Sequence, residues 1–278
     1  MDMRANILVG LANASPNYGI QPRGKLTAQI LRDIWEIGVN RVDSARDYEF
    51  AEEVLAETKL NWRVQTKFKL PKVYDSFDDL LRAAKIAIEN IEVECLLVHT
   101  PDLFQISRAN QVVLDLKKIS EVLEIPQVGI SIYRPHELEL LQDWQNLDVL
   151  QFPHNPLDTN CLDWLRLIRK GKFPKLQARS IYLQGLLISE TSHNVNLPIR
   201  LSEILSAWEK WTIDLGINSQ AYCATFAFGN LEIDEIVVGV DSAEQLRQLI
   251  SNVVEPKDLP VYPKVIPAEF TDPRRWSY

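Results

Sequence analysis

The stretch VNRVDSARDYEFAEEVLAETKLNWRVQTKF, residues 39–68, contains one complete unit of the pattern that decides the fold. It begins with a short run containing β-branched residues, 39–43, and ends with a second such run, 63–68. An amphipathic segment separates the two runs. Two short runs joined in this way are typical of two parallel strands with a helical connection.

The same pattern repeats along the chain. Eight candidate strands begin between residues 5 and 235, at a mean spacing of about 33 residues, which suits a full strand–helix unit. Most of the runs are continuously apolar, as expected for strands that are buried on both faces. The eight runs are 5–11, 39–43, 63–68, 94–99, 127–132, 147–152, 176–182 and 235–240.

Helical signals fill the gaps between these runs. Residues 26–37 carry apolar side chains at helical spacing, and Gly38 ends that pattern. Ser76 and Asp79 form a capping-box pattern at the start of another helix. Pro135 suits the first turn of a helix that would bury Leu138, Leu141 and Trp144. Further helices are expected at 161–170, 201–214 and 219–228, the last two forming an extra element before the eighth strand.

Eight strand–helix units predict an α/β protein, specifically a (β/α)8 TIM barrel, with residues 1–278 as a single domain. The alternative is an open, doubly wound sheet. The phosphate-binding fingerprint GxGxxG of such sheets is absent, because the first run leads into LANASPNYG, residues 11–19. This absence favours the closed barrel.

Composition excludes several classes of protein. The chain of 278 residues is 46% hydrophobic and carries a net charge of −8, so it is neither disordered nor basic, and no nucleic-acid partner is expected. Its three cysteines match no disulfide framework and no zinc pattern. No run suits a signal peptide or a membrane helix. We expect a cytoplasmic protein that binds neither membranes nor metal, and that is a monomer or a weak homodimer.

Polar residues lie near the ends of five consecutive predicted strands. A lysine at a strand end can be a surface residue and a histidine can be a core residue, but all five in register are harder to explain structurally. Burying an unpaired charge is costly, and barrel enzymes place their reacting groups at the carboxyl ends of strands. The five residues are Asp43, Lys67, His99, Ser131 and Gln151.

Several blocks of the sequence resemble those of the aldo-keto reductases. VDSARDYEFAEEVLA, residues 42–56, is similar to the DTAxxYGxAExxLG block of that family. The resemblance covers nearly the whole chain and implies a (β/α)8 barrel that reduces carbonyl groups with NADPH or NADH. The other similar blocks are LLVHTPD (96–102), GISIY (129–133), LQFPHNPLD (150–158), RSIYLQGLL (179–187) and VVGVDSAEQL (237–246).

The resemblance places the family's catalytic tetrad on Asp43, Tyr48, Lys67 and His99. Tyr48 is then the proton donor to the reduced carbonyl oxygen. A free phenol, with a pKa of about 10, is a poor acid near neutrality. A lysine ammonium beside it would lower that pKa, Asp43 would keep Lys67 charged, and His99 would orient the substrate carbonyl. This chemistry requires no metal.

The resemblance also implies the residues that bind the cofactor. Ser131 and Gln151 match positions that bind the nicotinamide carboxamide, and either Arg179 or Tyr182 matches the residue that stacks on the ring. The phosphates are expected at the loop and helix after the eighth strand. Because no lysine or arginine precedes Arg247 there, we expect little discrimination between the two cofactors, or a preference for NADH. The matching loop residues are Gly239, Val240, Asp241, Ser242 and Gln245.

Two other functions compete with carbonyl reduction. The chain could be a regulatory barrel that binds the cofactor with little or no turnover. It could also be an aldolase or isomerase that uses Lys67 as a Schiff base, although that chemistry needs a lowered lysine pKa and Asp43 would raise it. A small carbonyl compound is the expected substrate, and the loops match no pattern that would name it.

Overall fold

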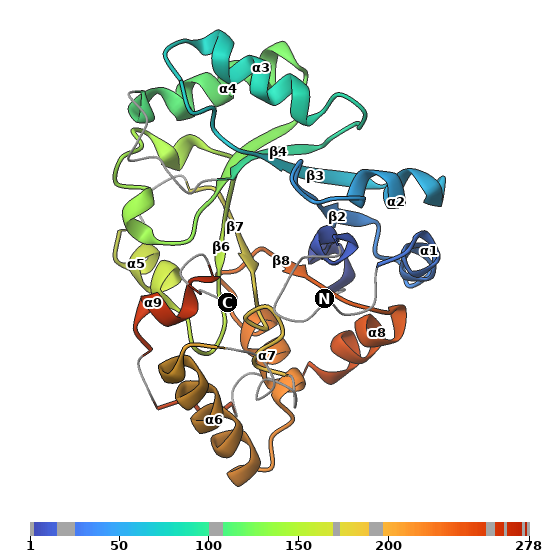
Figure 1. Cartoon of the computed structure of the whole chain (residues 1–278), viewed down its shortest axis with the longest axis vertical. Coiled ribbons are helices and arrows are strands. Elements are labelled where there is room, and N and C mark those ends of the chain that lie inside the picture. The colour runs from blue at the N-terminus through green and yellow to red at the C-terminus, as the bar shows by residue number, and fades with distance from the viewer. Residues whose placement is uncertain are drawn as a thin grey trace.

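The computed structural model describes residues 3–15, 26–99, 108–168, 173–188, 197–253, 259–263, 266–273 and 276. Each of its eight strands pairs in parallel with the next, and the last pairs with the first, so the sheet closes into a barrel (Figure 1). The eight predicted strands are therefore confirmed. They are β1 (Ile7–Gly10), β2 (Arg41–Asp43), β3 (Arg63–Phe68), β4 (Cys95–His99), β5 (Gln127–Ser131), β6 (Val149–Pro153), β7 (Lys175–Arg179) and β8 (Glu235–Val238).

Helices lie around the barrel, and the fold is the predicted (β/α)8 barrel. The last long helix, α8, packs against α1 and α7 (Figure 1). None of the helices in the described ranges is both long and apolar enough to cross a membrane. The helices are α1 (Ala28–Glu36), α2 (Ala51–Thr58), α3 (Phe77–Ala87), α4 (Val112–Val122), α5 (Asn160–Ile168), α6 (Ile199–Asp214), α7 (Ser219–Phe228), α8 (Ala243–Asn252) and the short α9 (Ala268–Thr271).

Local hydrogen bonds explain where several helices begin. The Ser76 hydroxyl accepts from the backbone N–H of Asp79, and the Asp79 carboxylate accepts from the backbone N–H of Ser76, so the predicted capping box is confirmed. At the start of α1 the Thr27 side chain accepts from the backbone N–H of Ile30, and at the start of α8 the Ser242 side chain accepts from that of Gln245. Each cap satisfies a backbone donor that has no partner within the helix.

The segment between β5 and β6 differs from the prediction. Pro135 begins a single 3₁₀ turn, Pro135–Glu137, rather than an α-helix, and a second such turn follows at Trp144–Asn146. Leu138 and Leu141 are buried as their spacing predicts, but the backbone bonds there run from residue i to residue i−3. The apolar spacing was thus a correct guide to burial and a wrong guide to backbone geometry, because tight turns bury the same side chains.

The seventh strand is shorter than predicted. It ends at Arg179 rather than continuing to residue 182, because Ser180, Leu183 and Gln184 have positive φ angles of 55°, 47° and 55° and turn the chain. Tyr182 consequently lies in the turn beyond the strand, whereas Arg179 is the last strand residue.

The interior of the barrel is unusually polar. Branched apolar side chains fill most barrels of this kind, and here Cys95, Leu97 and Val149 form only a small apolar cluster inside. Three buried glutamines, Gln65, Gln151 and Gln177, occupy positions on β3, β6 and β7. The large apolar core includes the outward-facing strand residues, which alternate with these inward-facing positions.

Candidate active site

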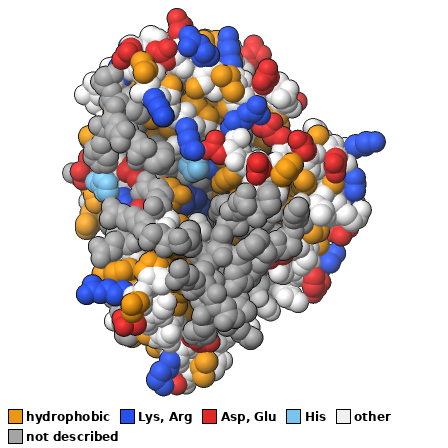
Figure 2. Space-filling model, viewed as in Figure 1, with side chains coloured by type: hydrophobic (Ala, Val, Ile, Leu, Met, Phe, Trp, Pro, Cys, Tyr) orange, Lys and Arg blue, Asp and Glu red, His pale blue; other side chains and the backbone are white. Residues whose placement is uncertain are grey.

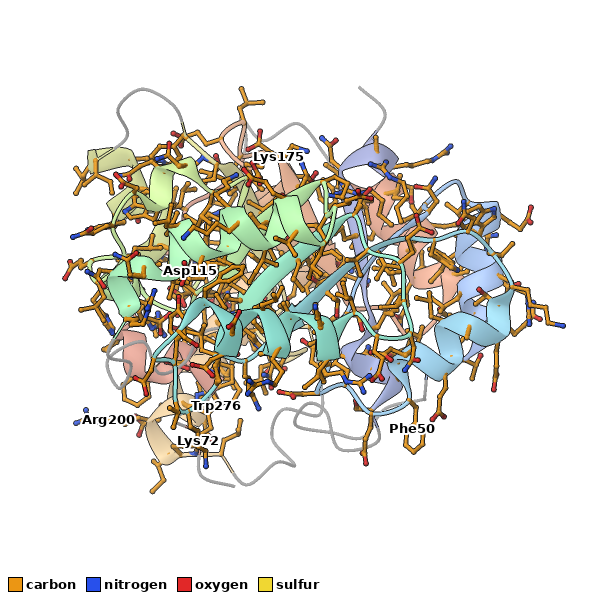
Figure 3. All side chains as sticks on the ribbon, turned by 90° about the horizontal axis from the view of Figure 1, so that it is seen from above. Phe50, Lys72, Asp115, Lys175, Arg200 and Trp276 are labelled. Atoms are coloured by element: carbon orange, nitrogen blue, oxygen red, sulfur yellow. The ribbon has the colours of Figure 1, made fainter. Side chains whose placement is uncertain are left out.

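Polar side chains lie at or near the carboxyl ends of six consecutive strands, β2 to β7. Because neighbouring strands run parallel around the closed barrel, the loops that follow them share one face. In Figure 3, Lys175, the first residue of β7, lies in the upper part, whereas Phe50 and Lys72, which follow β2 and β3, lie in the lower part. The six side chains are Asp43, Lys67, His99, Ser131, Gln151 and Arg179.

Lys67 and Asp43 form a buried ion pair. The Lys67 Nζ lies 2.5 Å from Oδ2 of Asp43, and the side chains are 1% and 4% exposed. Oδ1 of Asp43 accepts from the amides of Gln65, at 2.6 Å, and Gln151, at 3.1 Å. The pKa of Lys67 lies below its ordinary value, because burial lowers it by more than the Asp43 carboxylate raises it, which differs from the expectation that Asp43 would raise it. The predicted partnership between these two residues is thus present in the structure.

Tyr48 lies in the loop between β2 and α2, half-buried and next to this pair. The Lys67 Nζ is 5.6 Å from the centroid of the Tyr48 ring. The loop is anchored on β3, because the backbone N–H of Arg46 donates to the carbonyl oxygen of Lys67 at 2.9 Å. Phe50 then turns the chain into α2 with a φ of 63°. A fixed loop therefore holds the tyrosine ring near the lysine.

His99 is the last residue of β4 and is partly exposed. Its cross-strand partner on β5 is Ser131, so the two residues lie at the same level of the barrel. The structure thus brings together three members of the predicted tetrad, Asp43, Tyr48 and Lys67, and places His99 at the carboxyl end of a neighbouring strand.

Ser131, Gln151 and Arg179 form a second polar group. The Ser131 hydroxyl donates to Oε1 of Gln151 at 2.7 Å, and Nε of Arg179 donates to the Ser131 hydroxyl at 3.3 Å. Arg179 reaches across β6 to make this contact, and its guanidinium stacks on the Tyr133 ring at 4.1 Å from the centroid. Arg179 therefore lies over the mouth of the barrel, beside the two residues predicted to bind a carboxamide.

Tyr182, the alternative to Arg179, has a different environment. It is buried in the turn after β7, and burial raises its pKa above the ordinary value. Of the two residues expected to stack on a nicotinamide ring, Arg179 is the one whose hydrogen bond to Ser131 the structure describes.

The loop after β8 lies against the end of β1. The Asn13 amide donates to Oδ1 of Asp241 at 3.0 Å, and the backbone N–H of Asp241 donates to Oε1 of Gln245 at 2.7 Å. Ser242 caps α8, so the first turn of that helix opens beside Asp241. Gly239 and Val240 connect β8 to this turn, and the Val240 side chain is buried.

Sequence reasoning missed three residues of this region, Gln65, Gln177 and Asn13. Gln65 and Gln177 stand two positions before Lys67 and Arg179, and alternation along a strand places such pairs on the same face. That signal was available in the sequence. The contact between Asn13 and Asp241 joins residues 228 positions apart, and no local pattern predicts it.

Charges on the described part of the face in Figure 2 are mixed. Lysine and arginine side chains alternate there with aspartate and glutamate, without a continuous basic patch. Within the described ranges, no group of three or more histidine, cysteine, aspartate or glutamate side chains could hold a metal ion.

Solved structures resemble the whole barrel. The aldo-keto reductase AKR11C1 from Bacillus halodurans, in its holo form, matches with a TM-score of 0.66 and 14% identity over 93% of this chain and 94% of its own. The glycerol dehydrogenase AKR11B4 from Gluconobacter oxydans matches with a TM-score of 0.62 and 14% identity over 94% and 95%. An aldo-keto reductase from a deep-sea metagenome library matches with a TM-score of 0.55 and 15% identity over 95% and 88%.

The sequence matches no family model and no curated protein. At the identities of 14% and 15%, the structural matches establish the fold, and that fold is the one found in aldo-keto reductases. Function has to be argued from the site itself, because one barrel fold supports many chemistries.

Proposed function

We propose that this chain reduces an aldehyde or ketone to an alcohol by hydride transfer from a nicotinamide cofactor, with Tyr48 as the proton donor. The observation that carries the proposal is the buried Lys67–Asp43 pair, whose ammonium lies 5.6 Å from the centroid of the Tyr48 ring. The pair lies at the carboxyl ends of β2 and β3, where barrel enzymes perform their chemistry. Similarity to reductases and a dehydrogenase of the same fold supports the proposal.

The proton chemistry follows from the charges. A carbonyl that accepts a hydride becomes an alkoxide and needs a proton. The Lys67 ammonium stabilises the phenolate of Tyr48, so it makes the phenol a stronger acid, and Asp43 favours the charged form of Lys67. His99 donates a hydrogen bond to the substrate oxygen and orients it. The alkoxide is protonated by Tyr48, without a metal ion in the reaction.

The residues around Ser131 and the start of α8 fit a dinucleotide. When bound, the nicotinamide would supply the hydride. Ser131 would contact its carboxamide, whereas Gln151 is fully buried, donates to Asp43 and Gln177, and would act through its hydrogen bond to Ser131. Arg179 is better placed than Tyr182 to lie against the ring, because Arg179 donates a hydrogen bond to Ser131. The first turn of α8, with Ser242 as its cap, suits the phosphates. The segment from Gly239 to Gln245 would line this part of the site.

Cofactor choice depends on the same loop. Asp241 lies at the start of α8, and Arg247 is directed along the helix toward Glu244, with Nη1 3.6 Å from its carboxylate. A 2′-phosphate carries close to two negative charges and normally needs a fixed cation. This loop is therefore expected to bind NADH at least as well as NADPH.

A turnover screen tests the proposal. The purified chain is assayed with a panel of small aldehydes and ketones, with NADH and NADPH, by the absorbance of the reduced cofactor. We expect turnover of at least one carbonyl compound. Binding of cofactor without turnover of any compound would favour a regulatory barrel instead.

A further inference from the structure

The glutamine cluster, Gln65, Gln151 and Gln177, fills the middle of the barrel interior directly below the candidate active site. All three side chains are buried. An amide buried without hydrogen bonds is costly, and apolar residues usually occupy these positions. The partners of the three amides therefore indicate what the cluster does.

Two amides of the cluster share the same two acceptors. The side-chain nitrogens of Gln65 and Gln151 donate to Oδ1 of Asp43, at 2.6 and 3.1 Å. The same nitrogens donate to Oε1 of Gln177, at 2.7 and 2.6 Å. The other carboxylate oxygen of Asp43, Oδ2, accepts from Lys67. The two NH₂ groups therefore bridge the ion pair and the Gln177 oxygen, and that oxygen helps to hold them in place.

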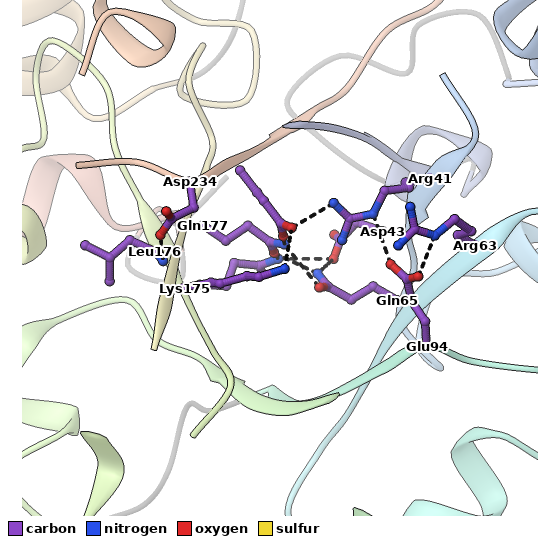
Figure 4. A network of polar contacts seen from close by, with 11 residues as sticks. Arg41, Asp43, Arg63, Gln65, Glu94, Lys175, Leu176, Gln177 and Asp234 are labelled. Atoms are coloured by element: carbon purple, nitrogen blue, oxygen red, sulfur yellow. Dashed lines mark hydrogen bonds and ion pairs between the residues drawn. The ribbon is translucent and has the colours of Figure 1, made fainter. Parts of the chain in front are cut away.

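The direction of these donors is fixed from the opposite end of the barrel. Nε2 of Gln177 donates to Oε2 of Glu235 at 2.9 Å and to Oε1 of Gln65 at 3.1 Å. Because a carboxylate accepts only, Glu235 fixes which end of the Gln177 amide carries the N–H groups, and the Gln177 oxygen is left to accept from the NH₂ groups of Gln65 and Gln151. Glu235 in turn accepts from Arg41 at 2.8 Å and from Lys175 at 3.3 Å (Figure 4). Burial raises the pKa of Glu235, but its bonds to Arg41 and Gln177 outweigh burial and leave the pKa below its ordinary value.

The ion pair needs such donors because it is buried. In surroundings of low polarity, transfer of a proton from Lys67 to Asp43 would give an uncharged pair and avoid the cost of two buried charges. The groups with the largest electrostatic effect on Lys67 include Asp43 from β2, Cys95 from β4 and Arg179 from β7, and the ring of Tyr48 lies beside it. Arg179 disfavours the lysine charge. Hydrogen bonds to Oδ1 of Asp43 favour the carboxylate.

We propose that Gln177 is a positioning residue which keeps the Asp43–Lys67 pair ionised by holding the Gln65 and Gln151 amides as donors to Asp43. The inference rests on the proposed function, in which the charge of Lys67 acts on Tyr48. It adds that this charge depends on Gln177, whose hydrogen bonds within the described part of the chain go to Gln65, Gln151 and Glu235.

The Gln177→Met variant tests this inference, because methionine has a similar length and cannot fix the two amides. Carbon NMR of labelled aspartate, with Asp43 assigned by the Asp43→Asn variant, measures the pH at which Asp43 takes up a proton. We expect that midpoint to rise relative to wild type, because the two amides are no longer held toward Asp43. The upper limit is about one pH unit for each hydrogen bond to the carboxylate that is lost, since such a bond is worth about a tenfold change. The acid limb of the pH–rate profile should move upward with it.

Two further variants make the test decisive. Gln65→Met removes one donor directly and should raise the midpoint in the same direction, and it carries the test if Gln177→Met does not fold. Val149→Ala, an apolar change inside the same barrel, should leave the midpoint unchanged. An unchanged midpoint in folded Gln177→Met, or an equal shift in Val149→Ala, would overturn the inference. If Gln177→Met does not fold, an unchanged midpoint in Gln65→Met would overturn it, because the amides would then have no effect on Asp43 for Gln177 to maintain. The NMR readout needs no cofactor or substrate, so failure of the proposed function is detected separately, in the turnover assay.

Discussion

His154 gives the protein a residue-level sensitivity to acid. Its ring is buried after β6 and stacks on Phe226 with 5.0 Å between ring centroids, and neither ring nitrogen has a hydrogen-bond partner among the described residues. Burial lowers its pKa from 6.5 to about 4. Below pH 6.5 the unfolded chain binds a proton that the folded chain excludes. The free energy of unfolding therefore falls as the pH drops through this window, by up to about 3 kcal/mol.

Replacement of His154 should remove this loss of unfolding free energy in acid. We expect His154→Phe, which keeps the stacked ring, to lose about 3 kcal/mol less unfolding free energy than wild type between pH 7 and pH 4, as measured by urea denaturation. The exposed His136→Gln variant serves as the control and should follow wild type. If His154→Phe loses as much stability in acid as wild type, the histidine is not excluded from protonation in the folded chain.

Asp241 should determine the choice of cofactor at the same scale. A carboxylate about 4 Å from one charge of a 2′-phosphate disfavours binding by roughly 4 kcal/mol at an effective dielectric constant of about 20, and a quarter of that is already several-fold in affinity. Asp241→Arg should therefore improve NADPH binding about fivefold or more, measured by quenching of tryptophan fluorescence. Arg247→Gln, the matched change, should have little effect. A tenfold preference of the wild type for NADPH would show that another cation serves the phosphate.

At the scale of single elements, the contact between β5 and β6 depends on a glycine. A Cβ added at Gly129 would lie 2.1 Å from the backbone oxygen of Val149, so the strands would have to separate. We expect Gly129→Ala to reduce the free energy of unfolding by about 3 kcal/mol. At Gly10 of β1 the nearest atom would be 3.4 Å away, so Gly10→Ala should cost less than about 1 kcal/mol. Equal losses in thermal or urea unfolding would contradict this.

The strands were predictable because their signal is strong and periodic. The runs at 63–68 and 94–99 match β3 and β4 to within one residue, since apolar residues buried on both faces leave a clear pattern. Helix starts with side-chain caps, such as Ser76, were predictable for a similar local reason. The turns after Pro135 were not, because an α-helix and successive 3₁₀ turns bury side chains at nearly the same spacing.

At the scale of the whole molecule, Arg134 anchors the carboxyl-terminal region to the barrel. This buried side chain donates to Asp158 after β6 at 3.0 Å and to the Thr271 hydroxyl of α9 at 3.0 Å. Its Nε also lies 3.9 Å from Asp272. Removal of the cation leaves two buried carboxylates without it, which is strongly destabilising.

Arg134→Met should therefore lower the free energy of unfolding by about 3 kcal/mol and make the region of residues 266–273 more susceptible to limited proteolysis. The exposed Arg166, which pairs with Glu232 and Asp163, provides the control. Arg166→Met should cost less than about 1 kcal/mol. If the two variants lose the same stability, burial of the Arg134 cluster does not decide its strength.

The site was predictable only in part. Asp43 and Lys67 could be paired from their strand ends, since carboxyl ends of parallel strands meet on one face. The hydrogen bonds that link Arg41, Glu235 and Gln177 below this pair could not be predicted. These residues come from distant segments of the sequence, which only closure of the barrel brings together. Three-dimensional closure, rather than local propensity, therefore determines what surrounds the ion pair.

The central claim is that Tyr48 donates the proton in carbonyl reduction, and the most direct test is the turnover rate of Tyr48→Phe with an aldehyde that the wild type reduces. The variant removes one hydroxyl and keeps the ring beside Lys67. We expect kcat to fall by about 10²–10⁴-fold while cofactor affinity, measured by tryptophan fluorescence, stays within about twofold. Tyr262→Phe, which removes a buried hydroxyl from a ring that packs against Trp208 and Trp211 of α6, should retain wild-type turnover. Full activity in purified Tyr48→Phe would contradict the account.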